Sequence, residues 1–232
     1  MPYNSNEIEV PLIGLRPDRL PRTIADRTRR VYDRLAFLYP LSTRFFHQKA
    51  HRTAIGMSGI ENGMRILEAA TGSGEMFRRL VNANPDGETL GFDLSPNMAA
   101  RTYRDIRRQF PAASTMCKAV DARYLPFRNG TFDAIVCCYL LELLAAEDIS
   151  RVMREFHRVL RPGMKLTLVM IGENKPLFNQ AYLLAGSVAP AFWGRQVEKR
   201  APEILEAAGF RLEKERVVRQ GFYPSRVVVA SR

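Results

Sequence analysis

The chain has 232 residues, of which 46% are hydrophobic and 25% charged, and its formal net charge is +11. The composition is ordinary for a soluble globular protein, and the length suits one domain with an elaborated end. No apolar stretch is long enough to span a bilayer, and the polar start MPYNSNEIEV is not a signal peptide. The positive charge favours acidic partners: nucleic acid, anionic lipid or a negatively charged small molecule.

Much of the positive charge is concentrated near the N-terminus. The arginines between positions 16 and 34 are Arg16, Arg19, Arg22, Arg27, Arg29, Arg30 and Arg34. A solvated helix face explains such a run, and so does contact with an anionic membrane surface or an acidic substrate. No aromatic side chain is interleaved with the arginines from Arg16 to Arg30, which counts against a single-stranded nucleic-acid site.

The N-terminal residues are expected to form a helical lid. Residues 23–60 suggest two helices, with Ile24, Val31, Leu35 and Leu38 on one face of the first. We assign residues 1–62 to this lid segment and residues 63–232 to the core.

From residue 64 onward, short apolar runs alternate with helical patterns. Strands are predicted at 64–69, 88–93, 114–121, 132–140 and 164–171, and helices at about 75–83, 96–109 and 146–160. This alternation predicts an α/β fold, a doubly wound parallel sheet covered on both faces. A further helix over 201–210 precedes two strands, 211–219 and 225–232, which we expect to pair antiparallel at the sheet edge. Residues 172–200 form an insertion placed to cover the carboxyl ends of the strands, where ligands of such sheets bind.

The turn after the first strand carries the clearest functional pattern, ILEAATGSGEMF. Gly72 and Gly74 let backbone N–H groups approach a ligand at the start of a helix. A dinucleotide fingerprint requires a third glycine where this chain has Phe77, and no P-loop lysine follows. The loop therefore lacks a pyrophosphate cradle.

Acidic residues follow at three neighbouring strand ends. Asp93 can accept both hydroxyls of a ribose, although a helix-capping turn with Ser95 and Pro96 also explains it. Asp121 can accept from an adenine amine, with the Ala122 N–H facing the ring, although a surface turn is the plainer explanation for it alone. Glu68 beside the loop suits a ligand with a cationic end. Adenosine that carries a sulfonium and an amino acid is S-adenosylmethionine.

The ordered set of motifs resembles the class I S-adenosylmethionine-dependent methyltransferases over about residues 64–171. The motifs are ILEAATGSG, GFDLSPNM, VDARYLPFRNGTFDAIVCCYLLEL and HRVLRPGMKL. The resemblance implies a Rossmann-like, seven-stranded sheet that is mostly parallel, with an antiparallel last strand. It also implies that the cofactor is lined by Tyr32, Glu68, Ala70, Gly72, Gly74, Asp93, Leu94, Asp121, Ala122 and Cys138.

Within that family, the chain is most similar to the ubiquinone/menaquinone-biosynthesis C-methyltransferases and their lipid-methylating relatives. The shared features are Ala70 in the first loop position, Tyr32-Asp33…Tyr39, and His51-Arg52. Those enzymes usually show Arg-Asn after the fourth strand, where this chain has Glu142-Leu143. The resemblance thus implies methyl transfer and leaves the acceptor open.

Methyl transfer requires alignment of acceptor and methyl group, exclusion of water, and a base where the acceptor is weak. Candidates for a catalytic base are His47, His51, Tyr39, Tyr139 and Glu142. His47 and His51 lie four residues apart and share a helix face, where a half-exposed pair is the plainer explanation. No third ligand accompanies this pair, so no metal site is predicted.

The cysteines indicate in which cellular compartment the protein is expected. Cys117, Cys137 and Cys138 form no disulfide framework, and two of them are adjacent within an apolar strand. We expect a reduced, cytoplasmic protein, with peripheral membrane contact as an alternative.

The leading hypothesis is a methyltransferase for a small-molecule or lipid-like acceptor, such as a quinol or an amine headgroup. A nucleic-acid methyltransferase is a second hypothesis, favoured by the charge but lacking the base-methylating motif after the fourth strand. A non-catalytic protein that binds the cofactor and serves as a partner is the third.

Overall fold

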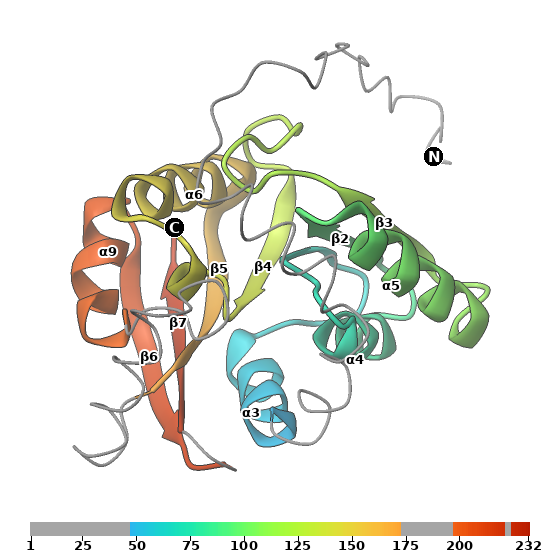
Figure 1. The fold of residues 1–232 in the computed structure, drawn as a ribbon, viewed down its shortest axis with the longest axis horizontal. Coiled ribbons are helices and arrows are strands. Elements are labelled where there is room, and N and C mark those ends of the chain that lie inside the picture. The colour runs from blue at the N-terminus through green and yellow to red at the C-terminus, as the bar shows by residue number, and fades with distance from the viewer. Residues whose placement is uncertain (1–46, 173–196, 221–223) are drawn as a thin grey trace.

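A computed structural model describes residues 47–172, 197–220 and 224–232 (Figure 1). Most of the predicted N-terminal lid, including the arginine cluster at 16–34, lies outside the described residues. The same holds for residues 173–196 of the predicted insertion.

The core is one seven-stranded sheet with strand order β3-β2-β1-β4-β5-β7-β6. Its strands are β1 (Arg65–Ala69), β2 (Glu88–Asp93), β3 (Ser114–Ala119), β4 (Phe132–Cys138), β5 (Leu160–Ile171), β6 (Arg211–Val218) and β7 (Ser225–Ser231). The pairs among β1 to β5 are parallel, and β7 runs antiparallel to both β5 and β6. The predicted fold class is confirmed, and the last strand inserts between β5 and β6.

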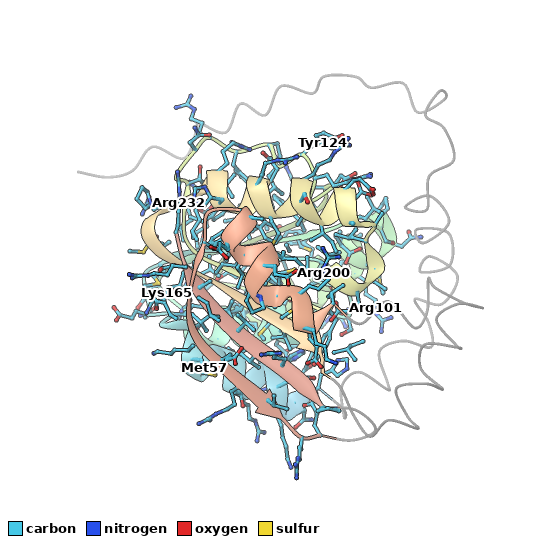
Figure 2. All side chains as sticks on the ribbon, turned by 90° about the vertical axis from the view of Figure 1, so that its left-hand side faces the viewer. Met57, Arg101, Tyr124, Lys165, Arg200 and Arg232 are labelled. Atoms are coloured by element: carbon cyan, nitrogen blue, oxygen red, sulfur yellow. The ribbon has the colours of Figure 1, made fainter. Side chains whose placement is uncertain are left out.

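Helices cover both faces of this sheet. They are α3 (Gln48–Ser58), α4 (Glu75–Ala83), α5 (Pro96–Gln109), α6 (Ala146–Val159) and α9 (Ala201–Ala207), with short 3₁₀ turns η1 (Leu141–Leu143) and η2 (Glu198–Arg200). Helices α6 and α9 pack on one face, and α3, α4 and α5 on the other. Figure 2 shows this division at the antiparallel end, where α9 lies in front of β6 and β7 and α3 lies behind them.

The two faces of the sheet are built by alternate residues of each strand, because successive side chains of a strand point to opposite sides. In β4, Ile135 and Cys137 join the core under α6 and α9, whereas Ala134 and Val136 join the core under α3 and α4. Both sets are buried, which explains why the central strands read as continuous apolar runs.

The strand order reverses between β1 and β4. Chain connections from β1 lead away to β2 and β3, and β4 returns to the other side of β1. In open α/β sheets, ligands bind at this switch point, beyond the carboxyl ends of the strands. Gly72, Asp93, Asp121 and Tyr139 all lie at or just beyond the carboxyl ends of β1 to β4, so the fold brings the predicted site residues to one edge.

Some predicted boundaries were wrong. β5 begins at Leu160 rather than at residue 164, because the chain goes straight from the helix into an extended segment where Leu160 pairs with Phe132. β3 ends at Ala119 and β4 at Cys138, two residues earlier than predicted in each case, where the chain turns out of the sheet. Within the described residues, no helix is both long and apolar enough to cross a membrane.

Candidate active site

The loop after β1 adopts left-handed backbone conformations that place it close to β2 and α5. The φ angles are 64° at Ala70, 50° at Gly72 and 78° at Gly74. A Cβ atom at Gly74 would lie 2.9 Å from the side chain of Thr102 on α5, closer than van der Waals contact allows. Glycine is therefore required at position 74. Ala70 occupies a conformation that costs a non-glycine residue energy, and such strain is concentrated at functional sites.

Asp93 holds this loop from the end of β2. Its Oδ2 accepts a hydrogen bond from the Gly72 N–H at 2.8 Å, and its Oδ1 accepts from the Ser95 N–H at 2.9 Å. Ser95 caps α5, since its Oγ accepts from the Met98 N–H at 3.3 Å, and Pro96 occupies the first turn of that helix. The helix-capping turn offered as an alternative therefore exists, and Asp93 additionally fixes the glycine loop.

Glu68 lies at the base of the loop with a side chain that is only 1% exposed. Its Oε2 is buried and has no hydrogen-bond partner in the described part of the structure. Burial raises the pKa of Glu68 well above its usual range, and the negative charge of Asp93 raises it further. Unpaired buried carboxylates are costly, so this oxygen is suited to a cationic group from a ligand.

Asp121 is more occupied than the sequence suggested. Its carboxylate accepts from the Arg123 side chain, with an Nη2–Oδ2 distance of 2.6 Å, and its Oδ1 also accepts from the Arg123 N–H. Arg123 reaches on to Asp148 of α6 at 3.1 Å. An adenine amine would have to share Asp121 with this guanidinium. Ala122 packs partly buried against the core beneath it.

Two further predicted lining residues lie at the same edge. Leu94 follows Asp93, and 37% of its surface is exposed, so it offers an apolar surface next to the proposed ribose site. Cys138 ends β4 on the same face of the sheet as Ile66 and Glu68. Burial, followed by the charge of Glu68, raises the pKa of the Cys138 thiol, so it behaves as a small neutral side chain.

His47, His51 and Tyr139 form an aromatic cluster between α3 and the end of β4. The rings of His47 and Tyr139 stack at 4.2 Å between centroids, and His51 lies 5.8 Å from His47 and 6.3 Å from Tyr139. Both histidines are only 5% exposed, so the expectation of a half-exposed pair is wrong. The helix face they share is turned inward, toward the sheet. Burial lowers the pKa of His47 to about 4 and that of His51 to about 3.

Tyr139 is anchored in an unusual conformation, with a φ of 55°. Its N–H donates to the Val169 carbonyl at 2.7 Å, and its hydroxyl lies 2.7 Å from the Ser225 hydroxyl and 3.3 Å from the Gln220 amide nitrogen. The Gln220 amide oxygen in turn accepts from the Ala50 N–H of α3 at 2.9 Å. This network joins α3, β4 and β7 around the aromatic cluster.

Glu142, the remaining candidate base, lies in η1 and is buried. Its Oε1 accepts from the Ile171 N–H at 2.6 Å, while its Oε2 has no hydrogen-bond partner among the residues described. Burial raises the pKa of Glu142 to about 7, with a smaller contribution from the charge of Glu198. A carboxyl with such a pKa is matched to proton transfer near neutral pH.

The other sequence predictions are not placed by the structure. Tyr32 and Tyr39 lie outside the described residues. The side chains that sequence reasoning missed are Arg123, Ser225 and Gln220. Arg123 carried a local signal, an opposite charge two residues after Asp121, but nothing in the sequence links Gln220 or Ser225 to Tyr139. In the ranges the structure describes, no group of three or more histidine, cysteine or acidic residues could hold a metal ion.

Comparison with known proteins gives a family match over the centre of the chain. A methyltransferase domain model matches residues 66–163. Over 138 residues, the chain is 28% identical to the ubiquinone/menaquinone biosynthesis C-methyltransferase UbiE of Desulfotalea psychrophila, covering 58% of this chain and 54% of that protein. It is 30% identical over 118 residues to the demethylmenaquinone methyltransferase of Thermus thermophilus, covering 51% and 52%. The matches thus span about half the length of these curated relatives.

Solved structures share the whole architecture. Magnesium protoporphyrin IX methyltransferase from Synechocystis, solved with bound SAH, superposes with a TM-score of 0.70 at 18% identity, covering 90% of this chain and all of that one. The [4+2]-cyclase SpnF superposes with a TM-score of 0.71 at 16% identity, covering 88% and 96%. Since one of these proteins is a cyclase, the fold alone does not decide the reaction.

Proposed function

We propose methyl transfer as the function of this chain, whose residues 66–163 belong to the class I S-adenosylmethionine-dependent methyltransferases. The family and the cofactor predicted from the motifs are confirmed at that level. The proposed reaction moves the methyl group of S-adenosylmethionine to a small-molecule or lipid-like acceptor.

One observation carries the proposal: the buried, unpartnered Oε2 of Glu68 beside the glycine loop, at the switch point of the sheet. A dinucleotide would present phosphates there, which offer no cation to the buried carboxyl of Glu68. S-adenosylmethionine brings an ammonium group and a sulfonium, which favour the ionised form of Glu68. Asp93 and the exposed Leu94 lie where the ribose and adenine of the same ligand would bind.

The roles of the side chains follow from this arrangement. When bound, the cofactor supplies a methyl group already activated on sulfur. Glu68 and the loop would hold the amino-acid end of the cofactor, Asp93 would hold its ribose, and the end of β4 with Tyr139 would face the acceptor. Glu142 and the two histidines remain candidates for proton removal, and Tyr39 stays a prediction.

The acceptor class is a finer proposal. The relatives named above are quinone-pathway methyltransferases, and the cluster of His47, His51 and Tyr139 offers flat ring surfaces with hydrogen-bonding atoms. Both features favour an aromatic, oxygen-bearing acceptor over an aliphatic amine.

Calorimetry tests the cofactor directly. We expect S-adenosylmethionine and its demethylated product to bind, and NAD to fail, because the loop lacks a pyrophosphate cradle. Glu68→Gln should weaken the binding of S-adenosylmethionine roughly tenfold, since it removes a charge-assisted contact of about 1.5 kcal/mol. The proposal would be contradicted if NAD bound comparably, or if neither S-adenosylmethionine nor its demethylated product bound. Mass spectrometry of reactions with candidate acceptors then checks transfer of the methyl group.

The arginine cluster at 16–34 supports a second proposal, contact with an anionic membrane. Arg27→Gln, Arg29→Gln and Arg30→Gln together should weaken binding to anionic vesicles, because each arginine near such a surface contributes about 1 kcal/mol. Cofactor affinity should stay unchanged. Sedimentation with anionic and neutral vesicles at two salt concentrations measures this, since screening acts within about 8–10 Å. If the substitutions instead reduce DNA or RNA binding with a steep salt dependence, that result would favour the nucleic-acid hypothesis. If neither assay changes, the arginines would be explained as a solvated helix face.

A further inference from the structure

His51 is a buried polar side chain whose hydrogen-bonding capacity is unused. Neither Nδ1 nor Nε2 has a hydrogen-bond partner in the described ranges, although the side chain is only 5% exposed. A neutral imidazole always carries one donor and one acceptor. Buried polar groups in folded proteins are nearly always paired, and each exception needs an explanation.

The surroundings of His51 do not supply that explanation. On its own helix, His47 contributes a ring 5.8 Å away, and from β4 Tyr139 contributes another at 6.3 Å. From α4, Arg79 lies near enough for its positive charge to lower the pKa of His51, although burial is the main cause. The Arg79 Nη2 donates to Glu75 Oε1 at 2.9 Å, whereas the buried Arg79 Nε has no hydrogen-bond partner in the described ranges. These neighbours keep His51 neutral and, among the residues described, leave both ring nitrogens without a partner.

His51 also lies near the proposed methyl-transfer site. Cys138, just before Tyr139, belongs to the same face as Glu68, and α4 begins at the glycine loop with Gly74 as its N-cap. The left-handed conformation of Tyr139, fixed by the Val169 carbonyl and by Ser225, holds its ring against His47. Three rings, one of them an imidazole with unused nitrogens, thus meet beside the end of β4.

We propose that His51 binds the methyl acceptor by donating or accepting a hydrogen bond at an oxygen of a planar ring, beside the stacked rings of His47 and Tyr139. This inference rests on the proposed methyl-transfer function and adds a residue that recognises the acceptor. It explains why a polar side chain is kept where an apolar one would cost less.

Stability gives the first test, because a structural and a ligand-binding histidine respond oppositely. If His51 is a ligand-binding residue, His51→Phe and His51→Leu remove a buried polar group that has no partner in the ligand-free protein. The melting temperature of the ligand-free protein should then rise by roughly 2–6 °C. His157→Phe is the matched control. His157 lies on α6, half-buried with its ring edge-on to Phe210 at 5.2 Å, and neither of its ring nitrogens is a buried atom without a partner, so this change should not raise the melting temperature. A fall in melting temperature for both His51 variants would assign His51 a structural role and overturn the proposal.

Recognition gives the second test, with two probes that differ only in their oxygens. We expect the wild-type protein, loaded with the demethylated cofactor, to bind a 2-prenyl-1,4-naphthoquinol, kept reduced, about tenfold tighter than 2-prenylnaphthalene. His51→Phe should abolish this preference, His51→Gln should restore part of it, and His157→Phe should leave it intact.

Cofactor affinity distinguishes failure of this inference about His51 from failure of the proposed methyl-transfer function. If the His51 variants bind S-adenosylmethionine as the wild type does and still prefer the naphthoquinol, this inference fails and the proposed function survives. A wild-type protein that binds the cofactor but does not distinguish the probes also overturns the inference. Absence of cofactor binding in the wild type would defeat the proposed function itself.

Discussion

Asp93→Ala should weaken S-adenosylmethionine binding by roughly 10- to 150-fold, the equivalent of about 1.5–3 kcal/mol for lost charge-assisted hydrogen bonds. Two contributions act together. The ribose loses its carboxylate acceptor, and the Gly72 N–H, now bonded to Asp93 Oδ2 at 2.8 Å, loses the anchor that fixes the glycine loop. Isothermal titration with the cofactor and its demethylated product measures the change.

Two further variants separate these contributions. Asp93→Asn keeps one acceptor oxygen for the Gly72 or Ser95 N–H but loses the charge, so its affinity should fall between wild type and Asp93→Ala. Asp133→Ala is the matched control. Asp133 accepts from the Arg65 N–H at 2.8 Å and pairs with Arg161, at the opposite end of the sheet. It should lower stability and leave cofactor affinity unchanged. Wild-type affinity in Asp93→Ala would remove Asp93 from the site.

Glu142→Gln should make the protein more stable than wild type at alkaline pH by about 3 kcal/mol. The pKa of Glu142 is about 7 in the folded protein against an ordinary 4.5, mainly because of burial and further because of Glu198. The folded state therefore holds a proton that the unfolded chain releases between these two values. The resulting stability is fully present below pH 4.5 and is lost as the pH rises through 7. The amide of the substituted side chain stays neutral at every pH and avoids this loss.

Urea denaturation of both proteins between about pH 4.5 and 9 measures the difference, which should be near zero at the acid end and grow through pH 7. His47 and His51 titrate in the opposite sense. Their lowered pKa values remove stability as the pH falls below 6.5, but they act equally in both proteins and cancel in the difference. A pH-independent difference would show that folding does not raise the pKa of Glu142.

Glu155→Gln provides a control of opposite sign. Although burial pushes its pKa up, hydrogen bonds from Arg158 and from the Leu125 N–H lower the pKa of Glu155 below its ordinary value. Its contribution to stability is therefore present above about pH 4.5 and lost in acid. This variant should be less stable than wild type at neutral pH, and the deficit should shrink as the pH falls.

The local structure of the core was largely set by the sequence. β2 and α5 have the predicted bounds, because an apolar run ends at Asp93 and Ser95-Pro96 supplies a helix cap and a first turn. The placement of Glu68, Asp93 and Asp121 at one edge also followed from the sequence, since the carboxyl ends of parallel strands meet there. These signals are short-range or repeat with a fixed period, so no long-range contact is needed to read them.

The burial of these side chains and their hydrogen-bond partners were decided by tertiary structure alone. Asp121 is engaged by Arg123 and through it with α6, and the two histidines are buried because α3 packs on β5 and β7. Gln220 reaches Ala50 across 170 positions, and Ser225 reaches Tyr139 across 86. Such contacts depend on strand register and helix packing, and the register sets which polar atoms meet a partner. Sequence could therefore locate the charges of this site, whereas only the folded chain determined that Glu68, Glu142 and His51 keep an atom without a partner among the described residues.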